Sequence, residues 1–150
     1  MNLILWRHAD AEDGIPDSAR ALTDKGRKQA KVIAKWLKAR LPADCVILVS
    51  PATRARQTAE ALNLAFETVS ALDVGTSPGQ VLAASGWPRR DGTILVVGHQ
   101  PTLGQVAARL LTGTDAEWPL KKCAVLWFEA RNRGGRDEAI LRAAMSPDLV

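Results

Sequence analysis

Short apolar runs alternate with longer amphipathic stretches along the first two thirds of the chain. Residues 3–6, 45–49 and 94–97 are aliphatic-rich runs bounded by polar or turn-forming residues. Such runs are typical of strands that are buried on both faces of a parallel sheet. Between the first two runs, apolar residues recur at helical spacing from Thr23, a residue type that caps helices, to Leu41 before a proline.

The remaining pattern predicts three more helices and a pair of strands. The helices are expected over residues 51–63, 78–85 and 101–111, and the two strands over residues 124–129 and 139–144, joined by a turn at residues 133–136. With neither a repeat nor a linker, residues 1–150 are expected to form one α/β domain. We predict three α/β/α layers around a mainly parallel sheet that ends in a C-terminal hairpin.

Composition excludes several classes of protein. The 150 residues are 47% hydrophobic and 24% charged, and no apolar run approaches the roughly 20 residues that span a bilayer. We therefore expect no membrane association, and because the start of the chain lacks a signal-peptide pattern we expect a cytoplasmic protein. The net charge of +4 is spread evenly, which argues against nucleic-acid binding but suits an anionic substrate.

Cysteine and histidine content narrows the chemistry further. Cys45 and Cys123 lie in apolar stretches and are expected to be buried, reduced thiols. Neither begins a C-x-x-x-x-x-R loop, so a cysteine-nucleophile phosphatase of that pattern is excluded. Two histidines are too few for a His-rich metal cage, and we expect neither a metal nor another cofactor.

Both histidines follow predicted strands. Arg7 and His8 come after the first strand, Arg54 lies just beyond the second, and His99 follows the strand at residues 94–97. Ligands of open α/β sheets bind beyond the carboxyl ends of the strands, so these side chains are expected to meet. Taken singly, each is more often structural; together, two guanidinium forks and two imidazoles suit a tetrahedral phosphate, with a neutral histidine as nucleophile.

Four ordered segments resemble the histidine phosphatase superfamily, which has the phosphoglycerate-mutase-like fold. They are residues 7–9 (R-H-G, with Ala9 in place of glycine), 20–30 (R-x-L-T-x-x-G-x-x-Q-A), 50–60 (S-P-x-x-R-A-x-Q-T-A-E) and 98–101 (G-H-x-P). The resemblance implies a catalytic phosphate pocket of Arg7, His8, Arg54 and His99, in which His8 is phosphorylated. It implies substrate-binding roles for Arg20 and Asp10.

The short chain resembles the compact SixA-like branch of phosphohistidine phosphatases. That branch implies phosphohistidine as substrate, either on a phosphoprotein or on a small phosphorylated molecule, with no metal. Two alternatives stay open: a phosphatase for small phosphate monoesters, and a non-catalytic phosphate-binding docking module. The sequence also leaves the oligomeric state open, a monomer included.

The proton donor is a second open point. Larger family members carry a glutamate after the Q-T-A-E helix, but residues 70–78 contain none. Asp10, Asp73 or no residue at all could serve as the acid. An imidazole leaving group makes the missing acid less important, because a ring nitrogen departs more easily than an alkoxide.

The first predicted helix is strongly basic. Between residues 24 and 41 there are seven Lys and Arg residues against the single acid Asp24. A solvated helix face is the favoured interpretation. A docking surface for an acidic phosphoprotein is the alternative.

Overall fold

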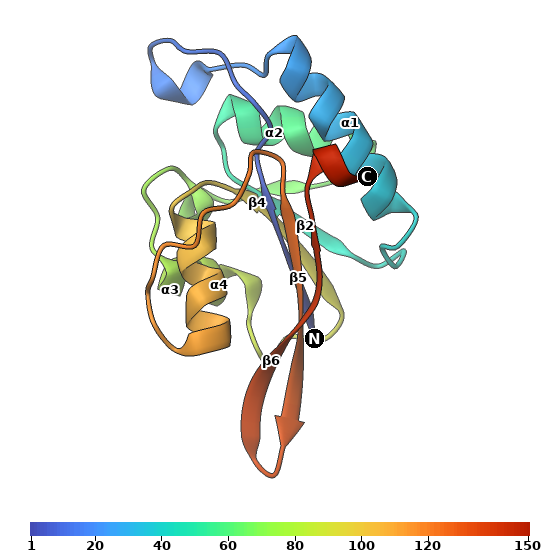
Figure 1. Cartoon of the computed structure of the whole chain (residues 1–150), viewed down its shortest axis with the longest axis vertical. Helices are drawn as coiled ribbons and strands as arrows, with labels where there is room; N and C mark the ends of the chain where they lie inside the picture. The colour runs from blue at the N-terminus through green and yellow to red at the C-terminus, as the bar shows by residue number, and fades with distance from the viewer.

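One six-stranded sheet, ordered β3-β2-β4-β1-β5-β6, runs through the computed structural model, which describes residues 1–150 (Figure 1). Strands β1 to β4 are parallel, whereas β5 and β6 pair antiparallel. This confirms the predicted mainly parallel sheet with a C-terminal hairpin. The strands are β1 (Asn2–Arg7), β2 (Val46–Val49), β3 (Glu67–Thr68), β4 (Thr93–Gly98), β5 (Val125–Arg133) and β6 (Arg136–Met145).

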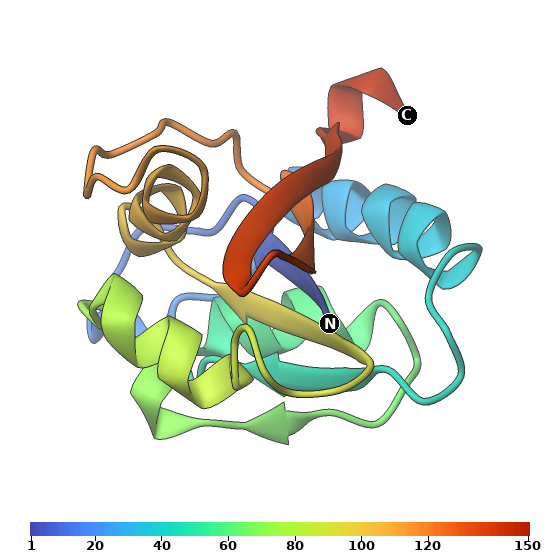
Figure 2. The ribbon, with the colours of Figure 1, turned by 90° about the horizontal axis from the view of Figure 1, so that it is seen from below.

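Helices cover both faces of the sheet, as predicted (Figure 2). Two pack on one face and two on the other, two short 3₁₀ turns lie in the connections, and a third follows the last strand. None of the helices combines the length and apolar character needed to cross a membrane. The helices are α1 (Asp24–Lys38), α2 (Thr53–Glu60), α3 (Pro78–Ser85) and α4 (Thr102–Thr112), and the turns are η1 (Asp17–Ala19), η2 (Ser70–Leu72) and η3 (Pro147–Leu149).

The central strand β1 divides its side chains between two cores. Ile4 and Trp6 pack with α1 and α2, whereas Leu3 and Leu5 pack with α3 and α4. All four are fully buried. Burial on both faces explains why the strand has no alternating polar pattern, and at roughly 1.5–3 kcal/mol for each large apolar side chain it fixes the strand firmly.

The helix ends follow local hydrogen bonding. Thr23 Oγ1 accepts from the Gly26 N–H at 2.9 Å, which confirms the predicted cap of α1. The helix ends at Lys38 rather than Leu41, because Leu41 precedes a proline and the chain closes in a turn onto the carbonyl of Leu37. Helix α2 is also shorter than predicted.

Two β elements differ from the prediction. The hairpin is longer, since β5 and β6 continue to Gly134 and Gly135, whose positive φ angles suit a two-residue turn. Its tip projects from the body of the molecule (Figure 1), so polar pairs such as Arg131 with Glu138 replace apolar contacts. The edge strand β3 has only two residues, both exposed, and carries no apolar pattern that could reveal it.

The two cysteines are free. Cys123 is fully buried, as expected, and its burial raises the pKa of the thiol to about 12. Cys45 is only half-buried, which corrects the prediction, because it lies at the rim of the core, one residue before β2 begins.

Candidate active site

The carboxyl ends of β1, β2 and β4 meet at one edge of the sheet. Register places Arg7 beside Gly98, so that His8 and His99 are the next residues on adjacent parallel strands. The two imidazole rings lie 5.1 Å apart between centroids, at an interplanar angle of 54°. Arg54, from the first turn of α2, donates its Nε–H to His8 Nε2 at 3.4 Å. Three predicted site residues are thus in direct contact.

His8 is held as a neutral ring whose Nε2 lone pair faces Arg54. Its Nδ1 lies 2.7 Å from the carbonyl oxygen of Ala9. Because a carbonyl only accepts, Nδ1 carries the proton and Nε2 does not. Burial lowers the pKa of His8 to about 3, and the positive charges of Arg54 and Arg7 act in the same direction. The ring therefore presents an unprotonated Nε2 at neutral pH.

His99 is held by a different partner. Its Nε2 lies 2.7 Å from Ser50 Oγ, at the end of β2. When that hydroxyl donates to Nε2, Nδ1 carries the ring proton, yet Nδ1 is buried and has no hydrogen-bond partner. Burial, followed by the charge of Arg54, lowers the pKa of His99 to about 4. In that tautomer, His99 offers a neutral N–H donor at Nδ1.

The two arginines are anchored at their outer edges. Arg7 Nη1 donates to the carbonyl oxygen of Leu120 at 2.6 Å, and burial lowers the pKa of Arg7 without discharging it. Arg54 is buried and donates from Nη1 and Nη2 to the carbonyl and carboxylate oxygens of Asp17, at 2.9 and 3.0 Å. The side of Arg54 that carries Nε consequently faces His8.

Two buried side-chain nitrogen atoms without hydrogen-bond partners also lie in the predicted phosphate pocket. Arg7 Nε and His99 Nδ1 are the only buried side-chain nitrogen or oxygen atoms in the chain that lack a hydrogen-bond partner. Buried polar atoms are almost always satisfied, so each exception needs a reason. Both belong to donor groups of the predicted pocket, and an acceptor-rich anion would satisfy them together. The arrangement can therefore bind a tetrahedral oxyanion beside the His8 lone pair.

Motif residues outside the pocket hold its loops together. Thr58 Oγ1 accepts from the N–H of Ala9 and donates to the carbonyl of Arg54, which links the segment after β1 to α2. Gln57 and Gln29 accept backbone N–H groups of the loop between β1 and α1, at Leu22 and Asp10. These hydrogen bonds explain why glutamine and threonine recur at fixed distances from the arginines.

A glycine lets that loop approach α1. A side chain at Gly26 would place its Cβ 2.0 Å from the carbonyl oxygen of Asp10, which is closer than any real contact. Only glycine fits here, because the backbone after His8 lies directly on the helix.

The other predicted residues lie outside the cluster. Arg20 contacts Asp17 and the carbonyl oxygen of Glu12, so it reaches Arg54 only through the Asp17 carboxylate. Asp10 accepts from Thr23 and Lys122, on the side of the site toward α1. Asp73 accepts from the N–H of Val74 and shapes its own turn. The structure joins neither Asp10 nor Asp73 to the histidine pair.

Sequence reasoning missed Asp17. Its carboxylate bridges Arg20 and Arg54, and both arginines lower its pKa. The one available signal was the spacing of Asp17 and Arg20 in a loop, which ordinarily indicates only a local turn. As for metal ligands, the chain has no group of three histidine, cysteine or acidic side chains placed to hold an ion.

Comparisons with known proteins identify relatives of this chain. Residues 3–78 match the family model described as histidine phosphatase superfamily (branch 1). Phosphohistidine phosphatase SixA of Escherichia coli K12 is 33% identical over 122 residues, which cover 75% of this chain and 76% of the relative. The SixA homolog of Haemophilus influenzae is also 33% identical and covers 96% of both chains.

Solved structures give the same result. The putative phosphohistidine phosphatase SixA from Nakamurella multipartitia superposes with a TM-score of 0.82 at 27% identity, covering 97% of this chain and 95% of that one. The protein histidine phosphatase SixA complexed with tungstate superposes with a TM-score of 0.80 at 28% identity, covering 99% of both chains. The chain described here belongs to the histidine phosphatase superfamily, branch 1.

Proposed function

We propose that this protein is a metal-independent phosphohistidine phosphatase that acts on a phosphorylated protein through a phospho-His8 intermediate. The observation that carries the proposal is the pairing of an unprotonated His8 Nε2 with the two unsatisfied donors, Arg7 Nε and His99 Nδ1. A nucleophile beside groups that can donate to an anion suits phosphoryl transfer. The tungstate complex of a similar SixA supports an oxyanion site in this fold.

The reaction proceeds in two displacements. His8 Nε2 attacks phosphorus in line, the bond from phosphorus to the substrate nitrogen breaks, and the substrate imidazole leaves with that electron pair. Water then attacks phospho-His8, the bond to Nε2 breaks, and the protons of the water remain on inorganic phosphate and solvent. In both steps Arg7, Arg54 and His99 bind the equatorial oxygens, where charge accumulates.

The state of the nearby carboxylates favours phosphohistidine over an ester. Hydrogen bonds from Lys122 and Thr23 lower the pKa of Asp10, and those from Arg20 and Arg54 lower that of Asp17. Both are ionised at neutral pH and are poor proton donors. An alkoxide leaving group needs such a donor, whereas a phosphoimidazole protonated on its second nitrogen leaves as neutral imidazole.

A trapping experiment tests the intermediate. The protein is mixed with radiolabelled phosphohistidine peptide in the presence of EDTA and quenched in alkali. We expect a protein-bound label that survives base, is lost in acid, and is absent from His8→Ala. Full turnover by His8→Ala would contradict the mechanism, and loss of turnover on adding EDTA would contradict metal independence.

A substrate comparison separates the alternatives. We expect kcat/KM for phosphohistidine to exceed that for a sugar phosphate or phosphoserine at equal ionic strength. Faster hydrolysis of the esters would favour a phosphatase for small monoesters. Tight phosphate binding without turnover of any substrate would favour a docking module.

A further inference from the structure

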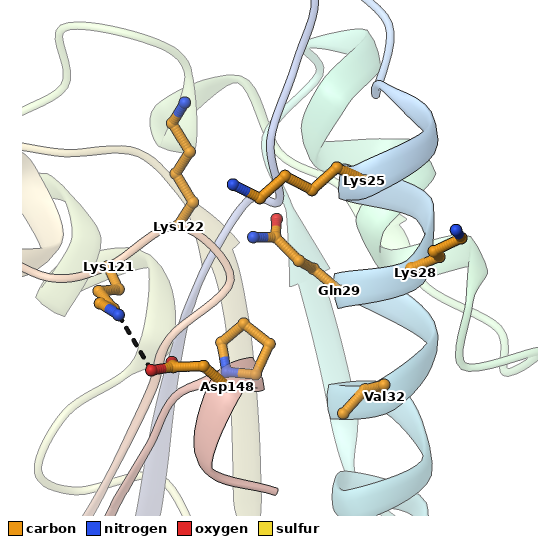
Figure 3. A pocket seen from close by; sticks show the side chains of 8 residues that line it. Lys25, Lys28, Gln29, Val32, Lys121, Lys122 and Asp148 are labelled. Atoms are coloured by element: carbon orange, nitrogen blue, oxygen red, sulfur yellow. Dashed lines mark hydrogen bonds and ion pairs between the residues drawn. The ribbon is translucent and has the colours of Figure 1, made fainter.

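A groove lined with lysines lies near the phosphate pocket (Figure 3). It is a groove of about 640 Å³ between α1 and the segment that leads into β5, with η3 at one side. We call it the lysine groove, after four of its lining residues: Lys25, Lys28, Lys121 and Lys122. It shares no residue with the catalytic cluster.

The charges of the groove are only partly compensated. Lys121 pairs with Asp148 at 3.0 Å, and Lys122 pairs with Asp10 at 2.5 Å. Lys25 and Lys28 have no carboxylate within 4.0 Å, so two lysines are free to bind an anion. Figure 3 shows Lys25 reaching from α1 across the groove toward the segment of Lys122, with Lys28 on the outer side of the helix.

Two short segments connect the groove to the catalytic pocket. The chain runs from His8 through Ala9 to Asp10, whose carboxylate holds Lys122. On the other side, the carbonyl of Leu120 anchors Arg7, and the next two residues are the groove lysines Lys121 and Lys122. The N–H of Cys123 also donates to the carbonyl of His8 at 3.1 Å. The groove residues Lys121 and Lys122 are therefore tied to the phosphate pocket through Leu120, which anchors Arg7, and through Asp10, which follows His8 by two residues.

We infer that the lysine groove binds an acidic stretch of polypeptide that flanks the phosphohistidine of a substrate protein. The inference rests on the proposed function, because the substrate must place its phosphate in the adjacent pocket. A protein substrate whose phosphohistidine enters that pocket would lay its neighbouring residues along the groove. Two free lysines and the partly paired Lys121 and Lys122 complement aspartate and glutamate side chains there.

Because the groove lysines are exposed, we expect them to affect substrate binding and not the chemical step. The side chains of Lys121 and Lys122 are 69% and 48% exposed, so their contacts with a partner stay hydrated and are screened by salt. Such charges raise the rate at which a complementary partner associates and strengthen its binding, and they have little effect on the rate of the chemical step. The groove is expected to influence KM and kcat/KM and to leave kcat unchanged.

The helix itself supplies a matched control. Lys25 and Lys28 line the groove, whereas Lys31 and Lys35 are also exposed on α1 but lie outside it. The double variants Lys25→Gln/Lys28→Gln and Lys31→Gln/Lys35→Gln remove the same charge from the same helix. A difference between them reports position and not net charge.

The experiment uses two phosphohistidine peptides of equal length, one with aspartate and glutamate flanks and one with serine and glutamine flanks. At about 20 mM salt, we expect Lys25→Gln/Lys28→Gln to lower kcat/KM for the acidic peptide by roughly three- to tenfold. The neutral peptide and an aryl phosphate should be unaffected, and at about 500 mM salt the difference should disappear. Equal losses in the two double variants, or no preference for the acidic peptide, would overturn the inference.

A binding measurement distinguishes failure of the groove from failure of the proposed function. The unphosphorylated acidic peptide is titrated into each variant at low salt, where binding requires no turnover. We expect weaker binding by Lys25→Gln/Lys28→Gln only, even if the protein hydrolysed no phosphohistidine. Binding of a single-stranded oligonucleotide of equal charge as tightly as the peptide would overturn the acidic-polypeptide assignment.

Discussion

The phosphate pocket and the lysine groove lie side by side but hold their cations in opposite ways. Arg54 is 4% exposed and fixed by the carbonyl and carboxylate oxygens of Asp17, and Arg7 is fixed by the carbonyl of Leu120. The groove lysines Lys121 and Lys122 have side chains that are 69% and 48% exposed and so face solvent. Fixed donors in a dry site act on the transition state, whereas hydrated charges act on encounter. We therefore expect substitutions in the pocket to lower kcat, by the same factor at low and at high salt.

The largest effect is expected from His8→Ala, because it removes the proposed nucleophile. Turnover should fall by roughly 10⁴-fold or more, while inorganic phosphate still binds through Arg7, Arg54 and His99. Steady-state kinetics and a phosphate titration measure the two quantities separately. If turnover fell only in parallel with phosphate affinity, His8 would be a binding residue like its neighbours.

Arg54→Lys tests whether the pocket needs a fixed fork or only a charge. Lysine keeps the charge but cannot donate to Asp17 and to a phosphate oxygen in the same planar arrangement. We expect kcat to fall by roughly 10²- to 10³-fold, at low and high salt alike. A loss that appeared only in KM and disappeared with salt would mean that Arg54 acts like the groove lysines.

The pH dependence of the free energy of unfolding tests whether the two histidines are buried in the pocket, unlike the exposed lysines of the groove. The pKa values of His8 and His99 in the folded protein, about 3 and about 4, lie below the ordinary value of 6.5. As pH falls below 6.5, the unfolded chain gains protons that the folded chain does not. The free energy of unfolding should therefore fall by up to about 1.4 kcal/mol per pH unit for each ring between about pH 6 and pH 5, and by less for His99 as the pH nears its folded pKa of about 4.

Urea unfolding at about pH 6 and about pH 5 measures this slope above the range in which the ordinary carboxylates titrate. The control is the double variant His8→Gln/His99→Gln, which should lose most of the slope. Equal slopes in the two proteins would mean that the pocket is hydrated, and the contrast with the groove would fail.

The sequence predicts the pocket better than its surroundings for a physical reason. Buried parallel strands leave uninterrupted apolar runs, and parallel pairing brings their carboxyl ends to one edge, so His8 and His99 could be placed together. The groove depends on Lys121 and Lys122 lying opposite α1, an arrangement that no periodicity encodes. The seven Lys and Arg residues of the first predicted helix indicated a charged face. They did not indicate that Lys25 and Lys28 are the two that line the groove.

Asp17 was hidden for a related reason. It lies in the loop before α1, and its main partner, Arg54, is 37 residues away in the chain. A lone aspartate in a loop is more often a turn residue than an anchor. Only coordinates show that its carboxylate joins Arg20 to Arg54.

The smallest effect is expected from substitution of Asp17. Its side chain is 53% exposed to solvent, whereas its partner Arg54 is buried. By holding the outer edge of Arg54, Asp17 keeps Nε directed at His8. Asp17→Asn retains an acceptor oxygen and Asp17→Ala does not. We expect kcat to fall roughly three- to tenfold in Asp17→Ala and less in Asp17→Asn, with KM nearly constant.

A lower KM with kcat unchanged would mean that Asp17 competes with phosphate for Arg54 and does not orient it. If its carboxylate competed with phosphate for Arg54, both variants would bind inorganic phosphate more tightly and KM would fall with kcat unchanged. The split between kcat and KM therefore decides the matter, and urea unfolding of each variant shows whether the fold is intact. Because η1 packs on α2 through this contact, a general loss of structure would also lower the unfolding free energy, whereas misdirection of Arg54 would change kcat alone.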